Sequence, residues 1–167
     1  MSEIRNEPSI LDDETVNQVR KAIEHRATWM GLMCDEAEKA GADWEGIARR
    51  AVRRTGCLHG NRILEVLVDA KGLRAFSEAF LPDLTKKLFE MEVTGLDGKG
   101  LDIEFHYCPL VSAWKKLGFD NGRIATLCDI AMDGDRGIAS EMGFDFQLGE
   151  TIAKGGDVCE VTFRKRG

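Results

Sequence analysis

The hydrophobic pattern of this sequence changes its period near Phe89, and that change limits the folds open to the chain. Before it, apolar residues recur every three to four positions, which is typical of amphipathic helices. After it, apolar and polar residues alternate in two pairs of short segments, as in strands with one buried face. Helices followed by hairpins predict an α+β fold, in which helices cover the apolar face of an antiparallel sheet.

The helical first half is divided by residues that start or stop helices. An aspartate stands at the start of the first two stretches and can cap the first turn. Glycine or proline stands where each stretch should end or divide. The expected helices cover about 12–40, 43–55 and 61–80, with breaks at Gly41, Gly56, Gly72 and Pro82.

The second half contains two hairpin patterns separated by helices. Residues 89–94 and 101–106 alternate around Asp97 and Gly98, a dipeptide that favours a tight hairpin turn. Residues 144–148 and 159–163 form the second alternating pair, and helices are expected at 110–117 and from Asp120 onward. We therefore predict a four-stranded antiparallel sheet made of two hairpins, with helices between them and the N-terminal helices packed on it.

Length and pattern favour one domain. The 167 residues fall within the usual range for a single domain. We expect a flexible lead-in at 1–11 and a single α+β domain at 12–167, mostly helical over 12–82 and hairpin–helices–hairpin over 87–167. A separate lobe for the N-terminal helical third is the alternative.

Composition excludes several classes of protein. Twenty-three basic and 29 acidic residues give a net charge of −6, which argues against a general nucleic-acid binder. No apolar run approaches the length of a membrane helix, and the polar N-terminus does not resemble a signal peptide. We expect a cytoplasmic protein that acts on a small molecule, with no nucleic acid or membrane partner; a homo-oligomer stays open.

Cysteine and histidine lie close together at two places. His59 follows Cys57 by two residues, and His106 precedes Cys108 by two. Cys108 also lies just before a helix that begins near Leu110, where free N–H groups should lower a thiol pKa. Cys108 is therefore a candidate nucleophile, with His106 or His59 as its base; the alternative is an ordinary polar sheet edge and a structural thiol.

The same four residues could hold a metal. Cys57, His59, His106 and Cys108 would supply two sulfur and two nitrogen ligands, a set that suits zinc. The odd number of cysteines and the lack of a Cys-x-x-Cys pair favour neither a disulfide framework nor a zinc ribbon. We expect no metal and no other cofactor.

An acidic segment around residues 127–137 is the third candidate. Asp129 and Asp133 are four residues apart and should share a helix face, and Asp135 and Arg136 follow. Carboxylates at the end of a helix oppose its dipole, so a positive group should compensate them: Arg136, a metal or a cationic substrate. A solvated helix end is the simpler interpretation.

Three longer segments carry a resemblance to a known family. HYCPLVSAWKKLG, LCDIAMDGDRGIA and FDFQLGETIAKGGDVCEVTF together resemble the L-2-amino-thiazoline-4-carboxylic acid hydrolase family, over about Asp43 to Arg164. The last segment is also distantly similar to 4-vinyl reductase-like ligand-binding domains, some of which bind metal through cysteine. The cysteine expected within their ETxC segment is absent here, where Thr151 and Ile152 stand.

The resemblance implies a hydrolase acting on carbon–nitrogen bonds of a cyclic amidine. Such an enzyme would open an L-2-amino-thiazoline-4-carboxylate-like ring to a carbamoyl amino acid. For this reaction, residue type and position suggest catalytic roles for Cys108, His106, His59 and Asp129. Asp129, Asp133 or Asp135 would bind the amidine cation, and Arg62 or Arg136 the carboxylate. The alternative is a non-catalytic domain that binds a small molecule or a metal.

Overall fold

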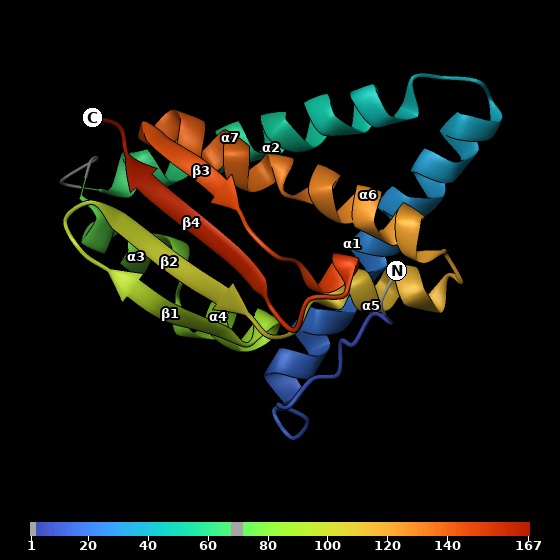
Figure 1. Ribbon diagram of the computed structural model, residues 1–167, viewed down its shortest axis with the longest axis horizontal. Helices are drawn as coiled ribbons and strands as arrows, with labels where there is room; N and C mark the ends of the chain where they lie inside the picture. The colour runs from blue at the N-terminus through green and yellow to red at the C-terminus, as the bar shows by residue number, and fades with distance from the viewer. Residues whose placement is uncertain (1–2, 68–71) are drawn as a thin grey trace.

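The computed structural model describes residues 3–67 and 72–167, and it confirms the predicted antiparallel sheet. The strands are β1 (Met91–Leu96), β2 (Gly100–Phe105), β3 (Phe144–Leu148) and β4 (Cys159–Lys165). They lie in the order β1-β2-β4-β3, so the two hairpins are joined side by side through β2 and β4 (Figure 1). Asp97 accepts hydrogen bonds from the N–H groups of Lys99 and Gly100, which closes the first hairpin.

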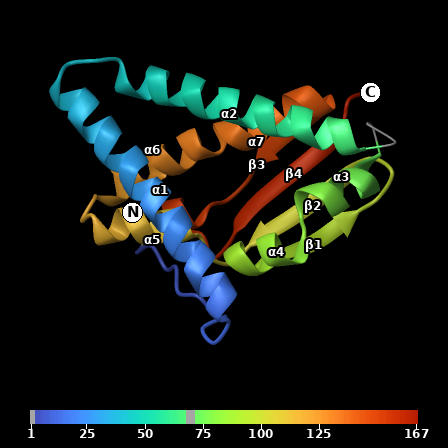
Figure 2. The same cartoon turned by 180° about the vertical axis from the view of Figure 1, so that it is seen from behind.

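Helices cover one face of this sheet and leave the other open (Figures 1 and 2). The covered face carries the alternating apolar residues of β2 and β4, among them Leu101, Ile103, Val161 and Phe163, each at most 1% exposed. The residues between them point to the open face and are polar. The core therefore lies between the sheet and the helical layer, as the alternation predicts.

The two longest helices confirm the predicted caps but not the predicted break. Asp13 caps α1 (Glu14–Lys39) and Asp43 caps α2 (Trp44–Val66). The expected end of the second helix at Gly56 is wrong, because α2 continues through it. A Cβ atom at Gly56 would overlap the carbonyl oxygen of Gly134, so this glycine allows two helices to touch rather than ending one.

The helix expected over 61–80 is two separate elements. Its first part belongs to α2, and its last part is α3 (Leu73–Phe80), which starts after Gly72. Residues 68–71, including the predicted apolar Val68, lie outside the described residues. Pro82 ends α3 as expected but also serves as the N-cap of α4 (Asp83–Phe89), a helix that the sequence pattern did not predict.

The segment between the hairpins holds one helix more than expected. The predicted α5 (Pro109–Lys116) and α6 (Asn121–Ala131) are present, and α7 (Asp133–Met142) follows after a break at Met132. A short 3-10 turn, η1 (Ile152–Lys154), precedes β4. None of the helices in the described part of the chain has the length and hydropathy needed to cross a bilayer.

Candidate functional site

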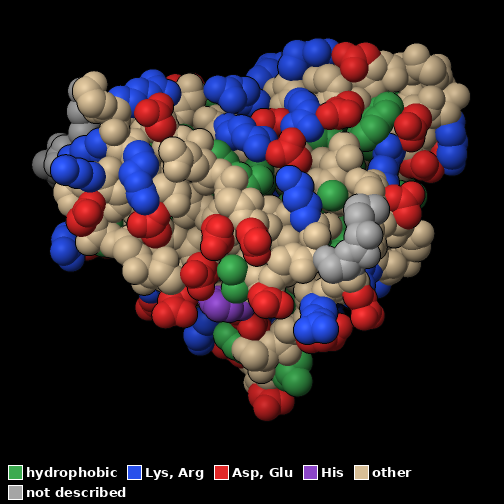
Figure 3. Space-filling view, viewed as in Figure 1, with side chains coloured by type: hydrophobic (Ala, Val, Ile, Leu, Met, Phe, Trp, Pro, Cys, Tyr) green, Lys and Arg blue, Asp and Glu red, His purple; other side chains and the backbone are tan. Residues whose placement is uncertain are grey.

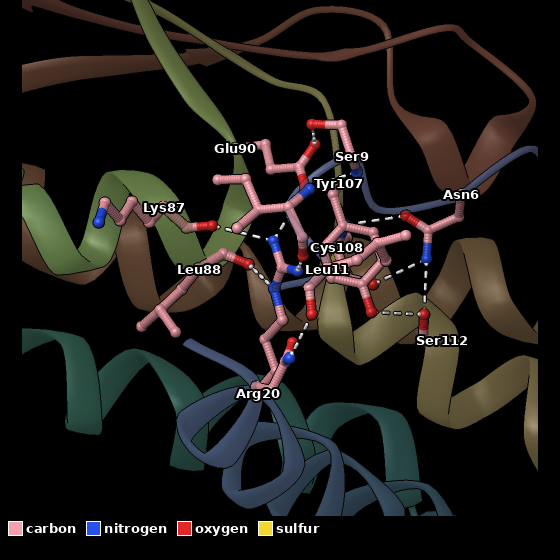
Figure 4. A network of polar contacts seen from close by, with 12 residues as sticks. Asn6, Ser9, Leu11, Arg20, Lys87, Leu88, Glu90, Tyr107, Cys108 and Ser112 are labelled. Atoms are coloured by element: carbon pink, nitrogen blue, oxygen red, sulfur yellow. Dashed lines mark hydrogen bonds and ion pairs between the residues drawn. The ribbon is translucent and has the colours of Figure 1, made fainter. Parts of the chain in front are cut away.

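The backbone of Cys108 is fixed by a side chain from the start of the sequence. Cys108 is the N-cap of α5, and its N–H donates to Asn6 Oδ1 at 2.8 Å. Asn6 Nδ2 donates in turn to the Cys108 carbonyl and to Ser112 Oγ, both at 2.9 Å (Figure 4). Asn6 is only 5% exposed, so these bonds form away from bulk water. Both backbone polar groups of Cys108 are thereby held in one geometry.

A buried ion pair extends this network into α1. Arg20 is 4% exposed, pairs with Glu90 at 2.9 Å, and lies 4.5 Å over the ring of Tyr107. Its guanidinium also donates to the carbonyl oxygens of Ile10, Lys87 and Leu88 (Figure 4). Arg20 thereby connects the segment before α1, through Ile10, with the end of α4 and with Tyr107, which follows β2.

The Cys108 thiol lies on the core side of this network, near two further thiols. Cys128 of α6 and Cys159 of β4 are both buried, and the negative charge of one thiolate would raise the pKa of its neighbours. The Ile152 N–H donates to Cys159 Sγ at 3.3 Å. We call Cys108, Cys128 and Cys159 the thiol cluster.

Burial controls the ionisation of the thiol cluster. It raises the pKa of Cys159 to about 12 and raises that of Cys128 as well. It also raises the pKa of Cys108, although the N–H groups of Val111 and Leu110 act in the opposite direction. The sequence predicted a lowered pKa for Cys108 from its place before a helix. The helix start is confirmed, but desolvation of the thiolate outweighs its effect.

His106 faces different surroundings from Cys108. It lies at the end of β2 on the open face of the sheet, where Figure 3 shows acidic side chains gathered beside a histidine. Its Nε2 is 3.7 Å from Glu92 and 3.8 Å from Glu104, and its side chain is 41% exposed. The structure therefore places this imidazole among carboxylates, while the Cys108 thiol packs against the core.

The other cysteine–histidine pair lies on α2. His59 and Arg62 are exposed on the surface, but neighbouring atoms shield part of the His59 ring from water; this partial desolvation and the charge of Arg62 lower the pKa of His59. Cys57 faces α7, with its sulfur 3.9 Å from the Gly137 carbonyl oxygen. Over residues 3–67 and 72–167 no three His, Cys, Asp or Glu side chains are arranged to hold a metal ion. The four-ligand set of the metal alternative is not brought together.

The acidic segment forms an ion-pair network that joins three helices. Asp129 pairs with Arg136 and with Arg49 of α2, each at 2.7 Å. Asp133 pairs with the same two arginines at 2.8 and 3.1 Å. Burial would raise the pKa of Asp129, but the two guanidinium groups lower it overall. Arg136 is thus one of the compensating charges the sequence predicted, although Asp133 begins α7 instead of sharing a helix with Asp129.

Asp135 has a different environment from its acidic neighbours. It lies in the first turn of α7, on the helix face that also carries the buried residues Ala139 and Met142. Burial raises the pKa of Asp135 to about 7, against smaller opposing effects of its own N–H and of Arg136. A substantial fraction of this carboxyl group is therefore protonated near neutral pH.

A surface cleft of about 530 Å³ lies on the other side of the Cys108 segment. The start of the chain, α1 and α5 form its walls. Two hydroxyl groups, four basic side chains and two carboxylates face it, and neither Cys108, His106, His59 nor Asp129 lines it. The lining residues are Asn6, Glu7, Pro8, Asn17, Arg20, Lys21, Glu24, Tyr107, Ser112, Lys115 and Lys116.

Sequence reasoning missed Asn6 and Arg20. Asn6 lies in a polar segment expected to be a flexible lead-in, and its partner Cys108 is 102 residues away, so no local pattern marks it. Arg20 did carry a signal, because it lies one helical turn after Val16 on the face that α1 buries. An arginine at a core position of an amphipathic helix indicates a buried partner.

Comparison with known proteins gives this α+β domain a family. The model of the L-2-amino-thiazoline-4-carboxylic acid hydrolase family matches residues 20–163. The chain belongs to that family. No curated protein matches the sequence significantly.

A solved structure shares the fold. It is the crystal structure of a trafficking protein particle complex subunit 3 from Naegleria fowleri covalently bound to palmitic acid. The TM-score is 0.58 at 14% sequence identity, and the similarity covers 86% of this chain and 95% of that one. At this identity the likeness concerns the fold.

Proposed function

We propose that the protein is a hydrolase that opens a small cyclic amidine of the L-2-amino-thiazoline-4-carboxylate type to a carbamoyl amino acid. Membership of the hydrolase family over residues 20–163 supports the reaction class. The observation that carries the site is the fixation of Cys108, whose N–H and carbonyl are both bound by Asn6, while its thiolate charge would raise the pKa of Cys128 and Cys159. A nucleophile held in this way approaches its target with little further loss of entropy.

The reaction has two steps that balance with water alone. The Cys108 sulfur attacks the carbon between the ring nitrogen and ring sulfur, the ring carbon–sulfur bond breaks, and the departing sulfur takes a proton. Water then attacks the same carbon, which becomes the carbonyl of the carbamoyl group, and the Cys108 thiol is released. The product of these steps is the N-carbamoyl amino acid, in which that carbon keeps both nitrogens. The proposed reaction therefore opens the ring at the carbon–sulfur bond and not at the carbon–nitrogen bond expected from the resemblance.

Two of the predicted residues carry this proposal. We assign Asp135, whose pKa burial raises to about 7, the role of proton donor to the departing sulfur, in place of the cation-binding role expected from the sequence. The raised pKa of Cys108 leaves little thiolate at neutral pH, and a bound amidine cation would favour the thiolate. Asp129, Asp133 and Arg136 pair with one another and with Arg49, while His59, His106 and Arg62 are exposed, so we assign them no step.

Turnover of L-2-amino-thiazoline-4-carboxylate tests the proposal, with product identified by mass spectrometry. We expect the full chain to form the carbamoyl amino acid. Cys108→Ser should lower kcat at least about 100-fold, as loss of a covalent nucleophile does. Cys34→Ser, which replaces a buried thiol of α1, is the matched control and should keep full activity. Activity of Cys108→Ser within twofold of the unchanged protein would contradict this assignment.

The second candidate is a binding domain without catalysis. The raised pKa values of all three clustered thiols favour it, because a protonated thiol is a weak nucleophile. The fold neighbour, a complex subunit covalently bound to palmitic acid, is one example of a ligand on this fold. Saturable binding of the thiazoline without product, across several cyclic ureas and thioureas, would establish this alternative.

A further inference from the structure

We infer that the cleft between the start of the chain, α1 and α5 is a second ligand site, which binds a small anion through carboxylate or phosphate oxygens. Its volume of about 530 Å³ lies within the range of small-molecule pockets. The site is independent of the reaction proposed above, because the Cys108 thiol does not line the cleft.

The charges that line the cleft favour an anion. In a protein with a net charge of −6, four of the side chains facing this space are basic and two are acidic. Arg20 is neutralised by Glu90, and Lys116 by Glu24. Lys21 forms no ion pair with any described residue, and the Lys115 ammonium uses one hydrogen on the Ile4 carbonyl. Two ammonium groups therefore keep hydrogens that can reach a ligand in the cleft.

The hydroxyl groups add a donor of fixed position. Asn6 Nδ2 uses both its hydrogens, one on the Cys108 carbonyl and one on Ser112 Oγ. The Tyr107 and Ser112 hydroxyls share one hydrogen bond of 3.0 Å. The two hydroxyl groups carry one hydrogen each, and one of these hydrogens forms the bond between them. No described residue accepts the other hydrogen. An acceptor oxygen in the cleft would satisfy it.

Burial and neighbouring contacts hold both hydroxyl groups in place. Tyr107 is 4% exposed, and its ring is held under the Arg20 guanidinium. Ser112 lies on α5 one turn after Cys108 and is held by Asn6. A donor that is already positioned loses little entropy when a ligand binds, which favours a specific site over loose attraction to lysines.

Calorimetric titration of the full chain with inorganic phosphate and, separately, with succinate tests this inference. We expect one saturable site per chain for at least one probe, and the stronger probe identifies the preferred oxyanion. Lys21→Gln should weaken binding about fivefold, the effect of an exposed charge close to the ligand. The matched control Lys99→Gln removes the same charge in the β1–β2 turn and should leave binding unchanged.

A second variant keeps the test independent of charge. The double substitution Tyr107→Phe with Ser112→Ala removes both hydroxyls and should also weaken binding, with folding checked by circular dichroism. The inference is overturned if neither probe saturates below roughly 10 mM, a range set by weak specific sites. Equal weakening by Lys21→Gln and Lys99→Gln, or none by Lys21→Gln, would overturn it as well. Binding that survives in Cys108→Ser separates this site from the proposed reaction.

Discussion

Glu90 combines a strained backbone with an unusually complete set of hydrogen bonds. Its φ of 50° lies in the left-handed region, which costs a residue with a side chain about 1 kcal/mol or more. Its carboxylate accepts from the N–H groups of Ser9 and Ile10 and pairs with Arg20. The strain at the end of α4 is thus offset by bonds that fix the start of the chain.

Acid should weaken the fold through Glu90. Burial would raise its pKa, but the hydrogen bonds from Ile10, Ser9 and Arg20 lower it overall. A group with a lowered pKa stabilises above its unfolded value, near 4.5, and loses that contribution as pH falls through the folded value. Glu90→Gln should cost about 3 kcal/mol of unfolding free energy at pH 7 because Arg20 stays buried and unpaired.

Denaturant melts of Glu90→Gln at several pH values check this expectation. The difference from the unchanged protein should shrink as pH falls below about 4.5. Glu78→Gln makes the same chemical change at an exposed position of α3 and should alter stability by less than about 0.5 kcal/mol. A pH-independent loss in Glu90→Gln would contradict the linkage.

Asp135 predicts the opposite pH dependence. Its pKa rises from 3.8 to about 7 on folding, so the folded state binds a proton that the unfolded state releases above pH 4. The free energy of unfolding is therefore unaffected by this group at low pH, and it falls as pH rises from about 4 toward 7. Asp135→Asn should therefore raise the melting temperature at pH 8 by at least about 3 °C, and have little effect at pH 4.

The enzymatic activity of Asp135→Asn tests the proposed role of Asp135 as proton donor. If Asp135 donates the proton to the departing sulfur, the variant is more stable and slower, a trade typical of functional residues. Calorimetry and turnover on the same preparation measure both. If the variant is more stable but fully active, the predicted pH dependence of stability holds and Asp135 is not the proton donor.

At the scale of elements, the contact between α2 and α7 shows why a glycine can mislead. Gly56 has low helix propensity and stands before a polar stretch, so the sequence predicts a break there. In the structure, α2 and α7 meet through glycines: a Cβ atom at Gly137 would lie 2.5 Å from the Arg53 carbonyl oxygen, and one at Gly60 would lie 2.9 Å from Glu141 Cβ. Here the glycines allow two helices to pack closely, and helix propensity alone cannot predict that role. For the same reason α7, with glycines at 134 and 137, was not expected.

Alanine at two glycines of this contact should have opposite effects. Gly56→Ala places its methyl group against the backbone of Gly134, which cannot move aside, and should cost at least about 2 kcal/mol. Gly134→Ala meets only Val52 Cγ1 at 3.7 Å and gains helix propensity, so it should be neutral or stabilising. Urea denaturation of both variants measures the difference; equal losses would show that close packing is not the cause.

At the scale of the whole molecule, the class of fold follows from local patterns and the pairing of hairpins does not. Asp97–Gly98 and the alternating residues were enough to predict each hairpin. The junction of β2 with β4 joins residues such as Leu101 and Phe163, far apart in sequence, and only their stronger apolar alternation indicates that these are the central strands. The candidate site depends on such distant contacts even more, which is why Cys108 was predicted and Asn6 was not.

The same register aligns like charges across the open face. Glu92 lies opposite Glu104, and Glu104 opposite Glu160, so three carboxylates form a row across β1, β2 and β4. Like charges directly opposite destabilise a sheet. Glu104→Gln should therefore raise the unfolding free energy by about 0.5 kcal/mol at low salt. The gain should fade near 1 M salt, where charges are screened; a gain independent of salt would exclude repulsion as its cause.

The bond between Asn6 and Cys108 has a consequence for the synthesis of the chain. The two residues are 102 positions apart, so Asn6 leaves the ribosome long before its partner exists. At about 5–20 residues per second, the wait is roughly 5–20 seconds. During that time α1 and α2 can form, but Glu90, Cys108 and Ser112, which hold Asn6, Ser9 and Ile10 in the folded protein, have not yet been made. The segment around Asn6 is therefore made well before it can dock, and Cys108 reaches its final geometry only when that segment binds it.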